Sequence, residues 1–197
     1  MGRPLRIALI GIDGSGKSTL ARSLAAELTA DGRPASYYEN AGGRPKLNKL
    51  ARRLGRRDAV ELFGAGGFLA IEMTVRWAAI SYALLRSRLT GHTAVMDRYT
   101  YCQLAAVRTR RQRGERAVRT FYRLFPRPDL VCFLAVDPVT AQRRVELRGI
   151  DNEELDYLVA ADNSYRSLPE WSHFVVVDAN ADRDDVRARV RELLQDA

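Results

Sequence analysis

Residues 11–18, with the sequence GIDGSGKS, constrain the fold of this chain more than any other segment. They fit the pattern G-x-x-x-x-G-K-[ST], and they lie between a short apolar run, Leu5–Ile10, and a stretch with apolar residues at helical spacing. Glycines let the backbone turn tightly and point its N–H groups inward, and a helix that begins at once adds the positive end of its dipole. The segment therefore predicts an anion-binding P-loop between a strand and a helix.

Each residue type in such a loop has a physical role. Lys17 would reach the β- and γ-phosphates of a nucleotide, Ser18 would place its hydroxyl on Mg²⁺, and Thr19 would touch the α-phosphate region. ATP and Mg²⁺ are thus the expected phosphate donor and cofactor. The residues expected to bind the donor through this loop are Gly11, Asp13, Gly14, Ser15, Gly16, Lys17, Ser18 and Thr19.

Apolar runs typical of buried strands alternate with segments of helical periodicity along the whole chain. The expected strands are Leu5–Ile10, Ala35–Glu39, Thr93–Met96, Leu130–Val136 and Phe174–Val177. The expected helices span about 17–31, 46–57, 67–89, 101–113, 115–124, 138–148, 151–168 and 182–195. This alternation predicts an α/β fold with a five-stranded parallel sheet and helices on both faces. No repeat or linker interrupts residues 1–197, so we expect a single domain.

Composition narrows the class of protein further. Hydrophobic residues make up 46% and charged residues 28%, which is ordinary for a soluble globular protein. Glu72 and Arg76 interrupt the most apolar stretch, 64–85, so we expect no membrane span. Two cysteines and a first strand that begins within five residues of the N-terminus predict a reduced, cytoplasmic protein without a signal peptide.

The net charge of +8 comes largely from two arginine-rich runs, at 44–57 and 108–127. Such a surplus favours a polyanionic partner, either a small nucleotide or nucleic acid, and solvated helix faces explain it equally well. A nucleotide-binding regulatory protein or a nucleic-acid-associated protein is therefore an alternative. A steep decrease of binding with salt concentration would identify the chain as a nucleic-acid-binding protein.

Residues outside the loop separate the classes of P-loop protein. The GTPase sequences N-K-x-D and D-x-x-G after a strand are absent beyond Lys17. Asp97-Arg98-Tyr99 follows the third expected strand, where small-molecule kinases of this fold carry an acid. Such kinases also carry a mobile, arginine-bearing segment that closes on ATP, and the residues suited to it here are Arg143, Arg144 and Arg148.

With these residues in place, the chain resembles the thymidylate kinase family of nucleoside monophosphate kinases almost from end to end. LIGIDGSGKSTLA is similar to F-E-G-x-D-G-x-G-K-[ST]-T, and RPDLVCFLAVDPVTAQRRVELRG to P-D-L-x-x-x-L-D-V-x-P-x-x-A-x-x-R-x-x-x-R-G. YENAGGRP is similar to R-E-P-G-G-T-P, and AVMDRYTYCQLA to V-x-x-D-R-Y-x-x-S-x-x-A-Y-Q. The resemblance implies phosphoryl transfer from ATP to dTMP in one P-loop kinase domain. It also implies a short lid at about 143–154 and a homodimer packed through the long helix at 67–89.

The resemblance further implies roles for individual residues. Those implied in catalysis are Asp13, Lys17, Arg98, Arg143 and Arg148. Those implied in binding the acceptor nucleotide are Asp13, Glu39, Glu72, Arg76 and Arg98. Arg144 corresponds to an arginine that packs on adenine, and Asp97 to an acid that helps Ser18 to hold Mg²⁺.

Departures from the family pattern gather on the acceptor side. Tyr38-Glu39-Asn40 replaces R-E-P, Glu72 replaces the aromatic residue on which thymine stacks, and residues 102–107 lack the Ser, Tyr and Gln of their block. Loss of one stacking platform costs about 1–3 kcal/mol per base. Glu72 would instead bond an amino group on another base or pair with Arg76, one helical turn on. A kinase for a non-thymidine or non-nucleotide acceptor is therefore a second alternative.

Overall fold

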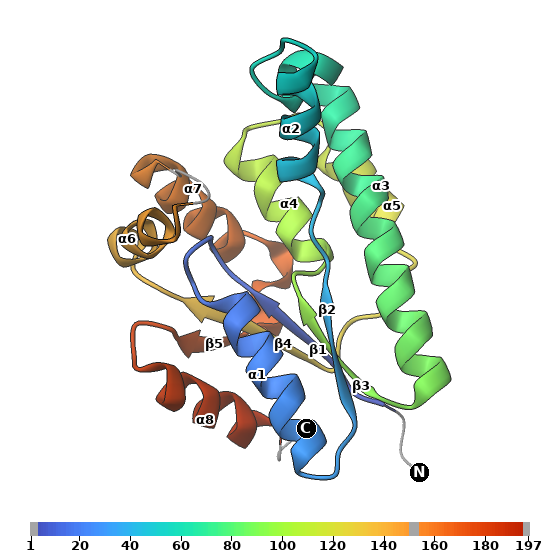
Figure 1. Cartoon of the computed structure of the whole chain (residues 1–197), viewed down its shortest axis with the longest axis vertical. Coiled ribbons are helices and arrows are strands. Elements are labelled where there is room, and N and C mark those ends of the chain that lie inside the picture. Colours follow the sequence, from blue (N-terminus) through green and yellow to red (C-terminus); the bar gives the residue numbers. More distant parts are fainter. Residues whose placement is uncertain (1–3, 150–153, 195–197) are drawn as a thin grey trace.

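The computed structural model describes residues 4–149 and 154–194, and a five-stranded parallel sheet lies at its centre (Figure 1). The strands are β1 (Arg6–Ile10), β2 (Ala35–Glu39), β3 (Thr93–Asp97), β4 (Leu130–Ala135) and β5 (Val175–Asp178). Their order in the sheet is β2-β3-β1-β4-β5, and every neighbouring pair is parallel. The structure confirms the predicted fold class, an α/β fold of the P-loop kind.

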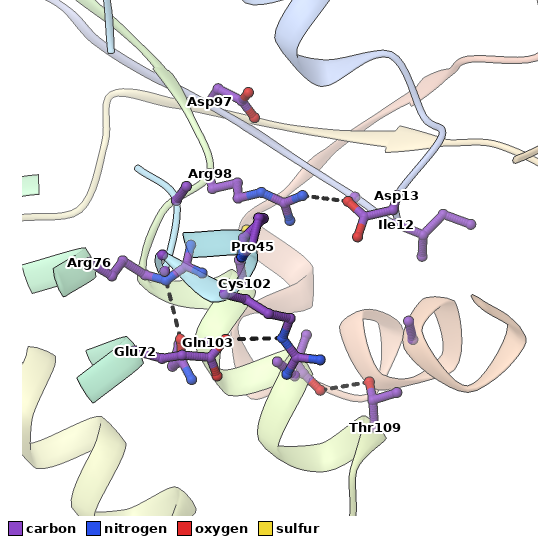
Figure 2. Close-up of a pocket in the computed structure, with 18 of the residues that line it drawn as sticks. Ile12, Asp13, Pro45, Glu72, Arg76, Asp97, Arg98, Cys102, Gln103 and Thr109 are labelled. Atoms are coloured by element: carbon purple, nitrogen blue, oxygen red, sulfur yellow. Dashed lines mark hydrogen bonds and ion pairs between the residues drawn. The ribbon is translucent and has the colours of Figure 1, made fainter. Parts of the chain in front are cut away.

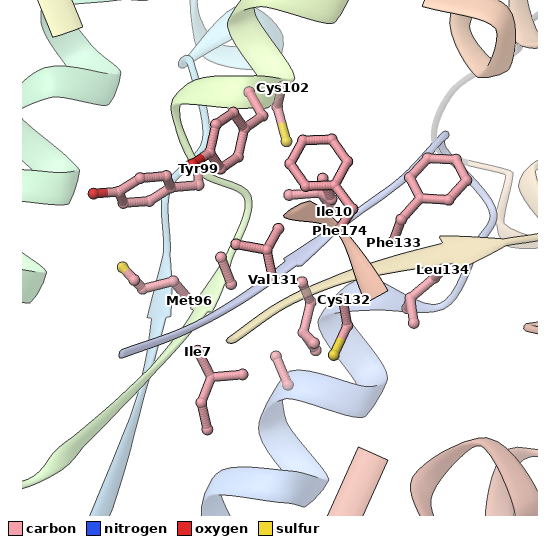
Figure 3. Packing of buried hydrophobic residues seen from close by; sticks show 14 of the residues in the cluster. Ile7, Ile10, Met96, Tyr99, Cys102, Val131, Cys132, Phe133, Leu134 and Phe174 are labelled. Carbon is pink, nitrogen blue, oxygen red and sulfur yellow. The ribbon is translucent and has the colours of Figure 1, made fainter. Parts of the chain in front are cut away.

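The central strands are apolar along their whole length because helices cover both faces of the sheet. In β4, residues Leu130–Leu134 are all buried, although successive side chains of a strand point to opposite faces. Figure 3 shows Cys132 pointing toward α1 (Lys17–Ala30), whereas Tyr99 and Cys102 lie on the opposite side of the sheet. The hydrophobic core is therefore continuous above and below the sheet.

The helices differ in what they pack against. α1 contacts β1, β2, β3 and α8 (Arg183–Leu193), whereas α3 (Ala59–Thr90) contacts β2 and β3, and α4 (Thr100–Thr109) packs against α7 (Leu155–Arg166). A 3₁₀ turn, Pro169–His173, leads into β5. The helices after α1 are α2 (Arg44–Arg53), α3 (Ala59–Thr90), α4 (Thr100–Thr109), α5 (Glu115–Tyr122), α6 (Pro138–Arg148), α7 (Leu155–Arg166) and α8 (Arg183–Leu193).

Helix boundaries are where the sequence-based expectations were least accurate. α3 begins at Ala59, well before the expected residue 67, because the Asp58 side chain accepts the backbone N–H of Glu61 at 2.9 Å and caps the helix. Gly64, with φ 70° and ψ 161°, kinks α3 after its first turns, and the expected helix began beyond this kink. The helix expected at 151–168 is described from Leu155, since residues 150–153 lie outside the described ranges.

α3 is long and apolar enough to cross a membrane when judged by length and composition alone. Two of its charged residues, Glu72 and Arg76, are nevertheless buried inside the protein, where they line a cavity. The opposite side of α3 exposes large apolar side chains, including Tyr82, Leu85 and Leu89. α3 thus has one side that belongs to the core and the cavity and another that is apolar and exposed.

β4 and β5 offer two substitutions that test where the core lies. Phe133 is fully buried, with its ring centroid 5.1 Å from that of Trp171, whereas Val176, its register neighbour on β5, is half exposed. We expect Phe133→Ala to lower the free energy of unfolding by about 3–5 kcal/mol, because it leaves a cavity. Val176→Ala should cost less than about 1 kcal/mol. Urea denaturation followed by circular dichroism compares the two, and equal losses would contradict this assignment of the core.

Candidate active site

Polar groups gather at the carboxyl edge of the sheet. β1 leads directly into the glycine-rich loop at residues 11–16, β2 ends at Glu39, and β3 ends at Asp97. Parallel strands end at the same edge, so these segments meet in space although they are far apart in the sequence. A cavity of about 290 Å³ opens there, and the residues lining it include Asp13, Glu39, Glu72, Arg76, Asp97 and Arg98.

Two glycines of the loop occupy positions that no other residue fits. Gly14 has φ 85°, and a Cβ atom on it would lie 2.3 Å from the carbonyl oxygen of Ala141. Gly11 has φ 144°, and its Cβ would lie 2.8 Å from the carbonyl oxygen of Leu134. The loop therefore packs tightly against β4 and α6, and it leads straight into the N-terminus of α1 at Lys17. This geometry suits a phosphate group.

Lys17 is buried inside the loop. Its Nζ donates to the carbonyl oxygen of Ile12 at 2.6 Å and to Ser15 Oγ at 3.2 Å, and it lies 3.9 Å from an Asp13 carboxylate oxygen. Burial, together with the nearby Arg98 cation, lowers the pKa of the Lys17 ammonium. A buried cation with only a distant carboxylate is costly to the folded state, and a bound polyanion would relieve that cost.

Ser18 and Asp97 form a pair of oxygen ligands beside the loop. Ser18 donates its hydroxyl to Asp97 Oδ2 at 2.5 Å, while Asp97 Oδ1 is buried and has no hydrogen-bond partner in residues 4–149 and 154–194. A hydroxyl and a carboxylate with a free oxygen are the kind of ligands that Mg²⁺ prefers. The two residues therefore fit a magnesium site.

Arg98 forms an ion pair with Asp13 at the side of the cavity nearest the loop (Figure 2). The Arg98 guanidinium, and to a lesser extent Lys17, holds the pKa of the Asp13 carboxyl well below its ordinary value. Arg98 also adopts a left-handed backbone conformation, with φ 77°, which residues other than glycine rarely adopt. A cation is thus held next to the phosphate-binding loop at the expense of backbone strain.

Arg76 and Gln103 form the far end of the cavity (Figure 2). Arg76 is buried, and it donates Nη1 to the carbonyl oxygen of Asn40 at 2.8 Å and Nε to Gln103 Oε1 at 3.2 Å. Because a guanidinium only donates, it fixes the orientation of the Gln103 amide. Gln103 Nε2 is then left as a buried donor without a partner in the described part of the chain. Such a group costs about 1–3 kcal/mol, which a ligand carbonyl oxygen would offset.

Glu72 has different partners from those expected. Its buried carboxylate accepts from Arg110 Nη1 at 2.9 Å and from Arg44 Nε at 3.4 Å. The expected pairing with Arg76 is wrong, because the Arg76 guanidinium is taken up by Asn40 and Gln103. Both oxygens of Glu72 are engaged by arginines, so its single negative charge is shared between two cations. It is therefore poorly suited to bonding an amino group of a base.

A second cavity lies on the other side of the glycine-rich loop, and Ser15, Gly16 and Thr19 line it. Arg144 also lines it and donates Nη1 to the carbonyl oxygen of Ala179 at 3.0 Å, so it lies on the side expected for the donor base.

The two arginines expected to act from the lid differ in position, and residues 150–153 of the expected lid lie outside the described ranges. Arg148 is exposed and lines both cavities, at their junction. Arg143 is exposed and lines neither of these two cavities. The described residues therefore place Arg148, but not Arg143, beside the predicted phosphate path.

Sequence reasoning missed two residues at the first cavity. Gln103 lines it, and Asn40 contacts Arg76 and Arg98, which line it, and neither Gln103 nor Asn40 carried a predicted role. Asn40 and Gln103 lie next to motif residues, on the segments that follow β2 and β3. Their partners come from other segments of the chain, so their spacing in the sequence gave no signal of these bonds.

Comparison with known proteins places the chain among nucleotide kinases. The family model described as thymidylate kinase matches residues 10–190. A probable thymidylate kinase of Archaeoglobus fulgidus is 29% identical over 195 residues, which cover 96% of this chain and 94% of that protein. A thymidylate kinase of Cereibacter sphaeroides is 29% identical, with 93% and 90% covered, and one of Xanthomonas campestris pv. campestris is 30% identical, with 92% and 79% covered.

Lys17→Met tests whether the lysine that the loop needs to bind phosphate also destabilises the folded protein. We expect turnover of ATP to fall at least about 100-fold, while the melting temperature rises or stays the same because a buried cation is removed. The pKa of Lys17 in the folded state lies below its ordinary value of 10.5, so the unfolded state binds more protons between those two values. As the pH rises toward 10.5, the free energy of unfolding of the wild type should therefore increase relative to that of the variant.

Differential scanning fluorimetry at several pH values measures this gain. Lys49→Met replaces an exposed lysine and serves as the control, with no expected change in activity or melting temperature. A strongly destabilised Lys17→Met protein would contradict the inferred cost of the buried ammonium.

Proposed function

The chain belongs to the thymidylate kinase family and is a nucleotide kinase, and on that premise we propose that it transfers the γ-phosphoryl group of ATP to dTMP, giving dTDP and ADP. The observation that carries the proposal is the cavity beside the glycine-rich loop. It has a phosphate-binding cation, Arg98, near the loop and hydrogen-bond donors, Arg76 and Gln103, at its far end. This arrangement suits a nucleoside monophosphate whose phosphate faces the donor.

ATP would bind with its phosphates in the loop and its base in the second cavity, near Arg144. Ser18 and Asp97 would hold Mg²⁺, which neutralises charge on the donor phosphates. Lys17 is buried beside the loop and would exchange its bond to the carbonyl oxygen of Ile12 for the β- and γ-phosphates. These residues orient the γ-phosphate toward the first cavity.

The acceptor needs no strong general base, because a phosphate monoester attacks with its own oxyanion. A bond forms between that oxygen and the γ-phosphorus, and the bond from the γ-phosphorus to the bridging oxygen breaks, so that ADP leaves with the electron pair. Arg98 would hold the attacking phosphate, and Asp13 positions the Arg98 guanidinium. Arg148, at the junction of the two cavities, is suited to stabilise the charge of the transferring group.

A second candidate acceptor follows from Glu72. The ion cluster of Glu72 with Arg44 and Arg110 stands where the resembled family has an aromatic platform, so part of the stacking energy for thymine is missing. A different nucleoside monophosphate with a carbonyl at the distal edge of its base would still satisfy Arg76 and Gln103.

The buried, unbridged thiols of Cys102 and Cys132 support a cytoplasmic location for either activity.

The exposed apolar side of α3 supports a homodimer. Leu85 and Leu89 are 57% and 72% exposed, and Trp77 of α3 packs against Phe121 of α5 at 6.5 Å between ring centroids. We expect light scattering to give twice the 22.1 kDa of one chain. Leu85→Glu should shift the protein toward the monomer, whereas Val139→Glu, at an exposed apolar position of α6, should not. A monomeric wild type at micromolar concentration would refute the dimer.

The acceptor is tested by ADP release from ATP and Mg²⁺ with dTMP, dUMP, dCMP, dAMP and dGMP. We expect kcat/KM for dTMP and dUMP to exceed that for dCMP by about tenfold or more, because an amino group in place of the carbonyl would face only donors. Gln103→Leu should lower kcat/KM for dTMP by about 5- to 100-fold while the KM for ATP stays unchanged. Lys17→Met and a reaction without Mg²⁺ give the background.

Each outcome of this panel has a distinct meaning. Turnover of dTMP makes the protein a thymidylate kinase whose ion cluster is tolerated. No turnover of dTMP together with turnover of another monophosphate would indicate a rebuilt acceptor pocket. No turnover of any nucleotide in the panel, with ATP still bound, would favour a non-nucleotide acceptor or a nucleotide-binding regulatory protein.

A further inference from the structure

Asn40, the first residue after β2, makes contacts with three residues of the site. Its backbone N–H donates to the carbonyl oxygen of Asp97 at 3.0 Å, and its side-chain Nδ2 donates to the carbonyl oxygen of Arg98 at 2.9 Å. Its own carbonyl oxygen accepts from Arg76 Nη1 at 2.8 Å. Asn40 is completely buried and does not line the cavity itself. Any effect on a ligand must therefore pass through its three partners.

The contact with Arg98 is the one that the Asn40 side chain alone provides. Arg98 lies in the left-handed region, with φ 77°, and its backbone N–H donates to the carbonyl oxygen of Leu9 at 3.0 Å. The Nδ2 group of Asn40 binds the other side of the same residue, at its carbonyl oxygen. Two hydrogen bonds thus fix a backbone conformation that an arginine would otherwise leave. The direction in which the Arg98 side chain enters the cavity depends on that conformation.

The contact with Arg76 links the two ends of the cavity. Arg76 forms the far end with Gln103, and Arg98 lies at the end nearest the glycine-rich loop. One buried residue therefore holds both arginines, one through its main-chain carbonyl and the other through its side-chain amide. In the R-E-P pattern the corresponding residue is proline, which has neither a backbone N–H nor a side-chain donor. This chain thus has contacts at residue 40 that a proline could not make.

We propose that Asn40 is a positioning residue for the acceptor nucleotide, which sets the place of the phosphate-binding Arg98 relative to the base-binding Arg76. The inference rests on the proposed function, in which Arg98 holds the acceptor phosphate. It assigns to the Asn40 side-chain amide an effect on acceptor binding and none on the binding of ATP, because that amide donates to Arg98 and forms no hydrogen bond with the glycine-rich loop in the described ranges.

Asn40→Ala removes the side-chain amide and leaves both backbone contacts of residue 40 in place. We expect the KM for the preferred acceptor to rise about three- to tenfold, as for the loss of one hydrogen bond, with the KM for ATP unchanged. Ser36→Ala is the matched control, because Ser36 also lies on the β2 segment and loses a side-chain hydrogen bond, to His92, at the far end of the strand. It should change neither KM.

A double-mutant cycle with Arg98→Ala separates positioning from a general loss of structure. If Asn40 acts through Arg98, the double variant should bind the acceptor no more weakly than Arg98→Ala alone. Additive losses, an unchanged acceptor KM in Asn40→Ala, or an equal rise in the KM for ATP would each overturn the proposal while leaving the kinase activity of the wild type standing.

A crystal structure of Asn40→Ala gives a readout that does not depend on turnover. The expected result is that Arg98 leaves the left-handed region and that its ion pair with Asp13 shifts or breaks. Arg98 retained at a positive φ with the same ion pair would refute the positioning role, even if no acceptor of the panel is turned over. Absence of turnover in the wild type would count against the proposed function instead.

Discussion

The site depends on the parallel pairing of β1 with β3. In their register Leu9 lies opposite Asp97, and the Arg98 N–H continues the ladder to the carbonyl oxygen of Leu9. This pairing places the end of β3 beside the beginning of the glycine-rich loop, so that Ser18 reaches Asp97 and Asp13 reaches Arg98. A shift of one residue in the register would send the side chains of β3 to the opposite faces and separate these groups.

The site concentrates positive charge and free donors before any ligand is present. Lys17 is buried without a close carboxylate, Arg76 is bonded only to neutral groups in the described chain, and Gln103 Nε2 has no partner there. Each of these features costs the folded state free energy, which the sheet and its two helical layers must offset. A bound nucleotide would satisfy all of them at once, so the same groups that weaken the fold favour binding.

The two sides of the glycine-rich loop differ in the side chains that they present. On the donor side, Arg144 lines the second cavity, and the loop glycines pack against β4 and α6. On the acceptor side, Glu72 is the centre of an ion cluster, and Asn40 stands where the R-E-P pattern has a proline. Arg148 is the one residue that lines both cavities in the described chain, so a change in the acceptor cavity can leave the donor cavity intact.

The fold class, the five strands and the glycine-rich loop could be predicted from the residues alone, because these depend on local patterns: apolar runs, helical spacing and the glycines that only a tight turn requires. The same patterns placed Asp97 and Arg98 at a strand end. The partners of Glu72, the orientation of the Gln103 amide and the contacts of Asn40 became visible only in the folded chain. Those contacts join segments far apart in the chain, and which donor meets which acceptor depends on how the helices pack around the sheet. Residue spacing carries no record of that packing.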